Sequence, residues 1–127
     1  MAVAAVLALG GAHAQDASVQ KVVGTWKGKV ELLDEPERTL VVTSVTRAGS
    51  IWVASIEYGP TGQKLGAFEG RVEQQRGATT LTFPVSTTRK VELSLVSETE
   101  LLGQLKISAE GSWVGRKMRL TKTADKP

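Results

Sequence analysis

The chain has 127 residues, a mass of 13.5 kDa and a net charge of +3; 41% of its residues are hydrophobic, 23% are charged and none is cysteine. This length and composition fit one globular domain, which excludes a disordered chain and two independent cores. The lack of cysteine excludes disulfides, thiol nucleophiles, thiolate metal sites and a lipidated cysteine anchor.

The N-terminal residues predict an export signal. Residues 1–9 are an apolar run, and residues 10–14 are mostly small and end in an Ala-His-Ala triplet typical of a cleavage site. We expect a signal peptide over residues 1–14, cleaved after Ala14, and therefore a periplasmic or secreted protein. Because no Lys or Arg precedes the run, a start inside a longer signal and a short buried helix are the alternatives. The run is shorter than the roughly 20 residues of a membrane-spanning helix, so no membrane span is expected.

Strands are expected over most of the remaining chain. After a polar lead over residues 15–21, apolar and polar residues alternate in successive segments, which is the pattern of half-buried strands. Turn-forming residues, such as the Gly-Pro-Thr-Gly of residues 59–62, separate these segments. The expected strands are residues 22–33, 38–47, 51–58, 64–75, 78–86, 89–96, 101–109 and 113–123. The domain accordingly spans residues 22–124, and residues 125–127 are a tail.

The seventh segment is compatible with two structures. Ser97 and Glu100 form a capping box, and the leucines that follow would suit one face of a short helix. Gly103 would interrupt that helix, and every second residue from Leu105 to Ala109 is apolar. A strand is therefore the preferred interpretation.

Eight strands joined mostly by short turns, without a helical crossover, favour antiparallel pairing. About eight twisted strands can close on themselves, which removes exposed edges and leaves an interior for side chains or one small ligand. The predicted fold is all-β, an eight-stranded antiparallel up-and-down barrel, with an open β-sandwich as the alternative. On the first strand, Trp26, Val30 and Leu32 share the expected inner parity.

Gly24, Thr25 and Trp26 resemble the Gly-X-Trp signature on the first strand of lipocalins and other calycin barrels. The chain is also similar to small bacterial exported domains, mostly without a known role, that open with Gly-X-Trp-X-Gly and end in an apolar strand carrying Lys or Arg. The resemblance implies that Trp26 closes one barrel end beneath a basic residue of the last strand, with a guanidinium across the indole. Inner parity favours Arg116 as that residue, and simple antiparallel register favours Arg119. The disulfide, long first loop and flanking helix of lipocalins are missing, which argues against a deep, gated pocket.

No reaction chemistry is expected. The one histidine, His13, lies in the expected signal peptide, which leaves the mature domain without an imidazole. The glutamates of the predicted strands take the polar parity, and the acidic turn at residues 34–37 lacks the spacing of a calcium loop. Lys27 and Lys29 alternate with neutral residues, and six aromatic residues are few for stacking bases. We therefore expect no catalytic residue, metal site, cofactor or nucleic-acid partner, and no enzyme.

Two binding functions remain. In the first, the barrel binds a small hydrophobic or amphipathic ligand, with Arg116 as a polar anchor and with Gly28, Gly70 and Gly103 leaving space. The expected wall is aromatic and comprises Trp52, Tyr58, Phe68 and Phe83. In the alternative, side chains fill the barrel, which binds an envelope protein or serves a structural role in the envelope. Its contacts would come from the rim loops at residues 34–37 and 59–64.

Overall fold

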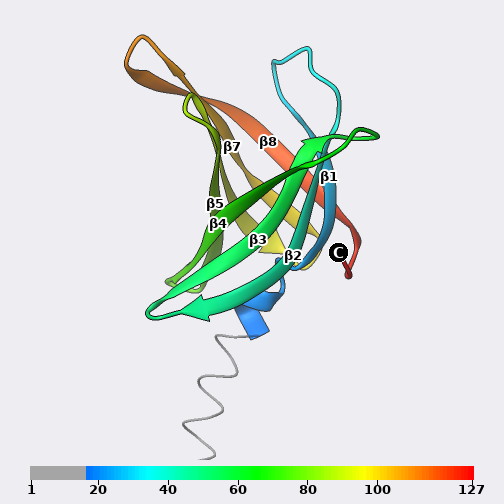
Figure 1. Cartoon of the computed structure of the whole chain (residues 1–127), viewed down its shortest axis with the longest axis vertical. Helices are drawn as coiled ribbons and strands as arrows, with labels where there is room; N and C mark the ends of the chain where they lie inside the picture. The colour runs from blue at the N-terminus through cyan, green and yellow to red at the C-terminus, as the bar shows by residue number, and fades with distance from the viewer. Residues whose placement is uncertain (1–16) are drawn as a thin grey trace, which may run out of the picture.

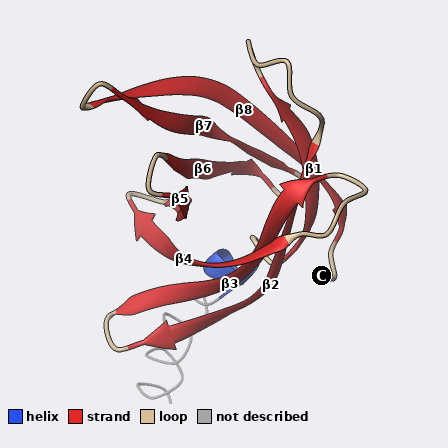
Figure 2. Ribbon diagram, turned by 45° about the horizontal axis from the view of Figure 1, so that its top comes forward, coloured by secondary structure: helices blue, strands red, loops and turns tan. Residues whose placement is uncertain are grey.

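The structure, a computed structural model, describes residues 17–127 and contains eight strands. They are β1 (Gly24–Val30), β2 (Arg38–Ala48), β3 (Ile51–Pro60), β4 (Gly66–Gln75), β5 (Ala78–Ser86), β6 (Arg89–Ser97), β7 (Glu100–Ala109) and β8 (Ser112–Ala124). Each strand pairs antiparallel with the next, and β8 returns to pair with β1, so the sheet closes into an up-and-down barrel (Figure 1; Figure 2). The predicted barrel is confirmed, and the open sandwich is wrong. The expected signal peptide, residues 1–14, lies outside the described residues.

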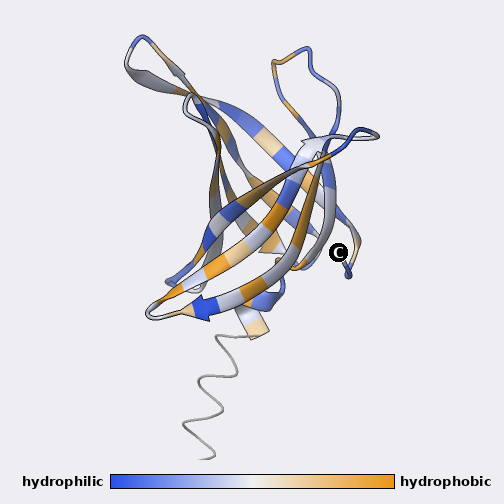
Figure 3. Ribbon diagram, in the orientation of Figure 1, coloured by the Kyte–Doolittle hydropathy of each residue, from blue (hydrophilic) through white to orange (hydrophobic). Residues whose placement is uncertain are grey.

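Apolar and polar residues alternate along the strands, as Figure 3 shows, and this alternation sorts side chains onto the inner and outer faces of the sheet. The apolar side chains of the inner face form one core with the segment that precedes β1. Burial contributes about 1.5–3 kcal/mol for each large apolar side chain. The buried members of the core are Val19, Val22, Trp26, Val30, Leu40, Val42, Val45, Ala54, Ile56, Tyr58, Val72, Leu81, Phe83, Val91, Leu93, Leu101, Leu105, Met118 and Leu120.

Two segments differ in how well they match expectation: the seventh strand and the end of the first. β7 is a strand over its whole length, because Leu101 and Leu105 are buried in the core between β6 and β8, so the helix alternative is wrong. Leu32, expected on the inner face, is instead 90% exposed. β1 ends at Val30, and Leu32 takes a left-handed backbone conformation (φ 63°) in the turn that follows.

One end of the barrel is covered by the chain that precedes β1. Residues 17–20 form a helical turn, and Val19 and Val22 are completely buried. The indole of Trp26 donates a hydrogen bond to the carbonyl of Val22 (2.9 Å), which joins this segment to β1. The expected polar lead thus supplies a core residue. We call this end the closed end, and we call the opposite end, where residues 31–37 connect β1 to β2, the mouth (Figure 1).

Three glycines on the inner parity let neighbouring strands approach each other. A Cβ on Gly28 would lie 1.8 Å from the carbonyl oxygen of Arg119, and one on Gly103 would lie 1.9 Å from that of Glu92. A Cβ on Gly70 would lie 3.1 Å from a carbonyl oxygen of β5. The space expected for a ligand is therefore taken by backbone beside Gly28 and Gly103, and beside Gly70 by the Ile56 side chain (2.7 Å) as well as by backbone. The glycines serve the tight curvature of a small barrel.

Candidate functional site

At the closed end, the basic residue that covers Trp26 is Lys122. Its ammonium lies 5.0 Å from the centre of the indole, and the Cα atoms of the two residues are register partners across β1 and β8. Neither of the two arginines predicted to cover Trp26 lies over the indole. Arg119 lies on the outer parity of β8 and pairs with Glu100 (3.7 Å), and Arg116 lies farther along β8 toward the mouth. The register between the first and last strands depends on the shear of the whole barrel, and this shear cannot be predicted from any single turn in the sequence.

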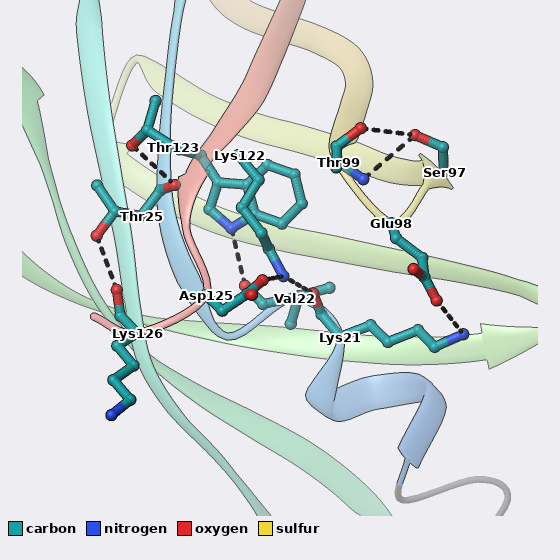
Figure 4. A network of polar contacts seen from close by, with 11 residues as sticks. Lys21, Val22, Thr25, Ser97, Glu98, Thr99, Lys122, Thr123, Asp125 and Lys126 are labelled. Carbon is teal, nitrogen blue, oxygen red and sulfur yellow. Dashed lines mark hydrogen bonds and ion pairs between the residues drawn. The ribbon is translucent and has the colours of Figure 1, made fainter.

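Lys122 also ties the two ends of the domain together (Figure 4). Its ammonium donates a hydrogen bond to the carbonyl of Lys21 (3.0 Å) and lies 3.5 Å from the carboxylate of Asp125. The hydroxyl of Thr25 donates to the carbonyl of Lys126 (3.2 Å), so the expected tail is joined to β1. Because these contacts all lie within the barrel and its two terminal segments, we assign this end a structural role.

The middle of the barrel is filled by side chains. Large residues from different strands, among them Leu40, Leu81, Phe83 and Met118, have no surface that a water molecule can reach. A side chain that lined a water-sized cavity would expose part of its surface to that cavity, so none adjoins these residues. A ligand that leaves this core in place must therefore bind at the mouth or outside the barrel.

Three of the residues expected to form a ligand wall lie together. The ring of Tyr58 packs edge-on against Phe83 (5.3 Å between centroids) and Phe68 (6.5 Å), and the two phenylalanine rings are 6.2 Å apart. We call these three residues the aromatic group. Trp52 lies apart from it beside the β2–β3 turn, with the Arg47 guanidinium 5.5 Å from its ring.

Two arginines other than the expected anchor meet a carboxylate at the mouth. Arg116, the expected anchor, has no ion pair in the described part of the chain and donates to the carbonyl of the adjacent Gly115 (3.3 Å). Glu35, in the loop between β1 and β2, accepts hydrogen bonds from both terminal nitrogens of Arg89 at 3.2 Å and from Arg38. Arg38 begins β2 and Arg89 begins β6, across the barrel from it, so these three residues, the mouth cluster, span the mouth.

The mouth cluster has more hydrogen-bond donors than acceptors. The Arg38 side chain is 13% exposed, and its Nε–H is buried without a partner among the described residues. Partial burial raises the pKa of Glu35, but hydrogen bonds and positive charge from Arg38 and Arg89 outweigh that effect, so the pKa is lowered overall. Two guanidiniums therefore face one ionised carboxylate at neutral pH. A buried donor without a partner costs about 1–3 kcal/mol, which an added acceptor would recover.

The mouth cluster acts on the aromatic group through Tyr58. Burial raises the pKa of Tyr58 above its ordinary value of 10.0, and the charges of the mouth cluster also act on this hydroxyl. The ligand site expected from the sequence did not include the mouth cluster. A signal for the arginines is nevertheless present, because Arg38 shares the parity of Leu40 and Arg89 shares that of Val91, and both of these apolar residues are buried.

The outer surface is hollowed in a different way. A solvent-open hollow of about 970 Å³ over β4, β5 and β6 is lined mainly by polar side chains, among them Arg71 and Glu73, which pair with each other at 4.0 Å.

In residues 17–127, no group of three or more acidic or histidine side chains is arranged to hold a metal ion. No helix in the described part of the chain is long and apolar enough to cross a membrane.

Comparison of the chain with protein-family models, with curated proteins and with solved structures gave no match. The likeness to calycin barrels is therefore one of architecture: a closed, eight-stranded antiparallel barrel with Gly-X-Trp on its first strand.

Proposed function

We propose that this protein is an exported, calycin-like barrel that binds a small amphipathic molecule through an anionic head group at its mouth. The observation that carries the proposal is the largely buried Arg38 guanidinium, whose Nε–H has no partner among the residues described. Buried polar groups are nearly always hydrogen-bonded, so an unpartnered donor on the strand that pairs with the Tyr58 strand supports a ligand at this position. An anion accepts from a guanidinium more strongly than a neutral group does.

The mouth offers complementary surfaces to the two halves of such a molecule. Arg38 and Arg89 would bind the head group, and the hydroxyl of Tyr58, which is neutral at physiological pH, can donate to it. The apolar part would lie against Phe68, the half-buried member of the aromatic group. Because the core beneath is filled, this contact is shallow, and we expect micromolar rather than nanomolar affinity. Export to the periplasm or the cell exterior is supported by the signal-like sequence of residues 1–14.

Isothermal titration calorimetry with octanoate and 1-octanol tests the proposal. We expect saturable binding of octanoate to the wild type and an affinity about tenfold weaker or worse for Arg38→Gln, which lacks the charged donor. The matched control is Arg71→Gln, which removes a 57% exposed guanidinium from the outer hollow and should bind octanoate as the wild type does. Equal affinities for octanoate and 1-octanol, or an unchanged affinity in Arg38→Gln, would contradict a head-group site at the mouth.

A second candidate function is that of a packed barrel that binds another protein of the cell envelope. It is supported by exposed apolar side chains on the β7–β8 hairpin, where Trp113 is 45% and Val114 is 40% exposed. The rim loops expected to make such contacts are bonded to each other, through the amide of Thr61 and the carbonyl of Glu37 (2.8 Å). A partner recovered from periplasmic extract by the wild type and lost in Trp113→Ser would support this candidate. Octanoate binding without any recovered partner would favour the first.

A further inference from the structure

We propose that residues 32–36 form a displaceable lid whose Glu35 carboxylate occupies the head-group site, so that the ligand head group is itself a carboxylate that exchanges with Glu35. This inference rests on the proposed function. It names the chemical class of the ligand and identifies a competitor built into the chain.

Glu35 shows which group the site accepts. Its Oε1 accepts hydrogen bonds from both terminal nitrogens of Arg89 at 3.2 Å, and its Oε2 accepts one from Arg38. The two guanidiniums come from β2 and β6, so each oxygen of one planar carboxylate has its own cationic partner. A ligand carboxylate of the same shape can take this place. Because it is not fixed to the loop, it can also accept from the Nε–H of Arg38, which Glu35 leaves without a partner in the part of the chain that the structure describes, while its chain lies against Phe68.

The main chain of the lid is fastened only at its flanks. On one side the amide of Glu31 donates to a carbonyl of β8 (2.8 Å), and on the other the carbonyl of Glu37 accepts from the amide of Thr61 (2.8 Å). Between these anchors, residues 31–32 form a turn, and residues 34–36 make no main-chain hydrogen bond within the described structure. The lid is held by the ion pairs of Glu35 and by the packing of the half-buried Leu33 against the core, so it can swing about two fixed ends.

A carboxylate on the lid lowers the affinity of the site for an external carboxylate. The short loop presents Glu35 at a high effective concentration, and a ligand binds only the fraction of molecules in which the lid is open. Removing this carboxylate therefore raises the apparent affinity. Asp34 provides the matched control, because it lies next to Glu35 on the same loop, is exposed, and makes no hydrogen bond or ion pair in the described structure.

The experiment compares the octanoate affinities of the wild type, Glu35→Gln, Glu35→Asp and Asp34→Asn at one ionic strength. We expect Glu35→Gln to bind about fivefold tighter or more, and Asp34→Asn to stay within about twofold of the wild type. Glu35→Asp keeps the negative charge of the loop on a side chain that is shorter and reaches the arginines less well, so it should also bind octanoate more tightly. This variant therefore distinguishes competition by a carboxylate in the site from simple repulsion by a charged loop. Without ligand, the NMR order parameters of the lid amides should fall in Glu35→Gln and not in Asp34→Asn.

The outcomes separate the lid from the site beneath it. If octanoate binds the wild type and Arg38→Gln weakens it, but Glu35→Gln binds no more tightly than the wild type, the lid is overturned and the head-group site stands. If neither the wild type nor Glu35→Gln binds octanoate while circular dichroism shows both to be folded, the lid and the proposed function are both overturned. Tighter binding of octyl sulfate or octyl phosphate than of octanoate to Glu35→Gln would overturn the assignment of the head group as a carboxylate.

Discussion

Replacing Lys122 with methionine isolates the ammonium that covers Trp26 at the closed end. Methionine keeps most of the aliphatic stem of a side chain that is 10% exposed and removes its charge. The substitution abolishes the 5.0 Å approach to the indole, the 3.0 Å hydrogen bond to the carbonyl of Lys21 and the 3.5 Å ion pair with Asp125. A hydrogen bond from a charged group contributes about 1.5–3 kcal/mol and a cation–π contact about 0.5–2 kcal/mol. Desolvation of the ammonium offsets part of this sum, so we expect a net decrease of about 2 kcal/mol in the free energy of unfolding.

Urea unfolding followed by far-ultraviolet circular dichroism measures this decrease. With a slope of about 1–3 kcal/mol per molar urea, the midpoint should fall by about 0.7–2 M. Lys117→Met is the control, because Lys117 is exposed on the outer parity of the same strand and its replacement should change the free energy of unfolding by no more than about 0.5 kcal/mol. Equal midpoints for Lys122→Met and Lys117→Met would refute the reasoning that Lys122 closes this end of the barrel.

Gly103→Ala should lower the free energy of unfolding, measured by thermal unfolding, by more than about 2 kcal/mol, because its Cβ would lie 1.9 Å from a backbone oxygen of β6. Gly115→Ala should be tolerated in the same assay, because the atom that its Cβ would meet at 1.9 Å is the end of the flexible Gln104 side chain. Glu35→Gln should cost about 1–2 kcal/mol at neutral pH. Because the pKa of Glu35 is lowered in the folded state, the stability lost in Glu35→Gln should shrink as the pH falls below 4.5 and vanish below the folded pKa. If urea unfolding gives the same difference between wild type and Glu35→Gln at every pH, the ion pairs do not stabilise the barrel. Tyr58, the one tyrosine, should ionise above pH 10.0 in the folded barrel because burial raises its pKa. The barrel should therefore lose stability as the pH rises through that range. Equal midpoints for absorbance titrations of the folded protein and of the protein unfolded in urea would contradict this.

Strands are predictable in this chain because a half-buried sheet requires alternation, and eight such segments separated by turns leave few ways to pair. The start of the first strand is less well predicted. Val19 and Val22 are both buried before β1 begins, and they are three residues apart, which is the spacing of one helical face and not of a strand. That spacing is visible in the sequence, so a helical turn ahead of Gly24 could have been predicted.

The partner of Trp26 could not be predicted in the same way. Neighbouring strands joined by a short turn take their register from that turn, but β1 and β8 come from the two ends of the domain. Their register depends on the offsets of all the hairpins between them, which together set the shear of the barrel. Arg116 and Lys122 share the inner parity of β8, and local patterning cannot choose between them.

The mouth is the part of a small barrel where function is least constrained by the fold. An eight-stranded barrel is just wide enough for its own side chains, so an interior that buries Phe83 and Met118 leaves little room for a ligand. Inward positions at the strand ends escape this limit, because loops rather than facing strands cover them. A guanidinium at such a position costs desolvation, and stability alone would favour an apolar side chain there. Arg38 and Arg89 begin their strands on the inner parity, and the carboxylate that joins them comes from a loop residue 54 positions away from Arg89 in the chain. The ion pairs fasten the β1–β2 loop to β2 and β6, and the proposed exchange of anions at the mouth would give a reason for placing guanidiniums, rather than apolar side chains, at these positions.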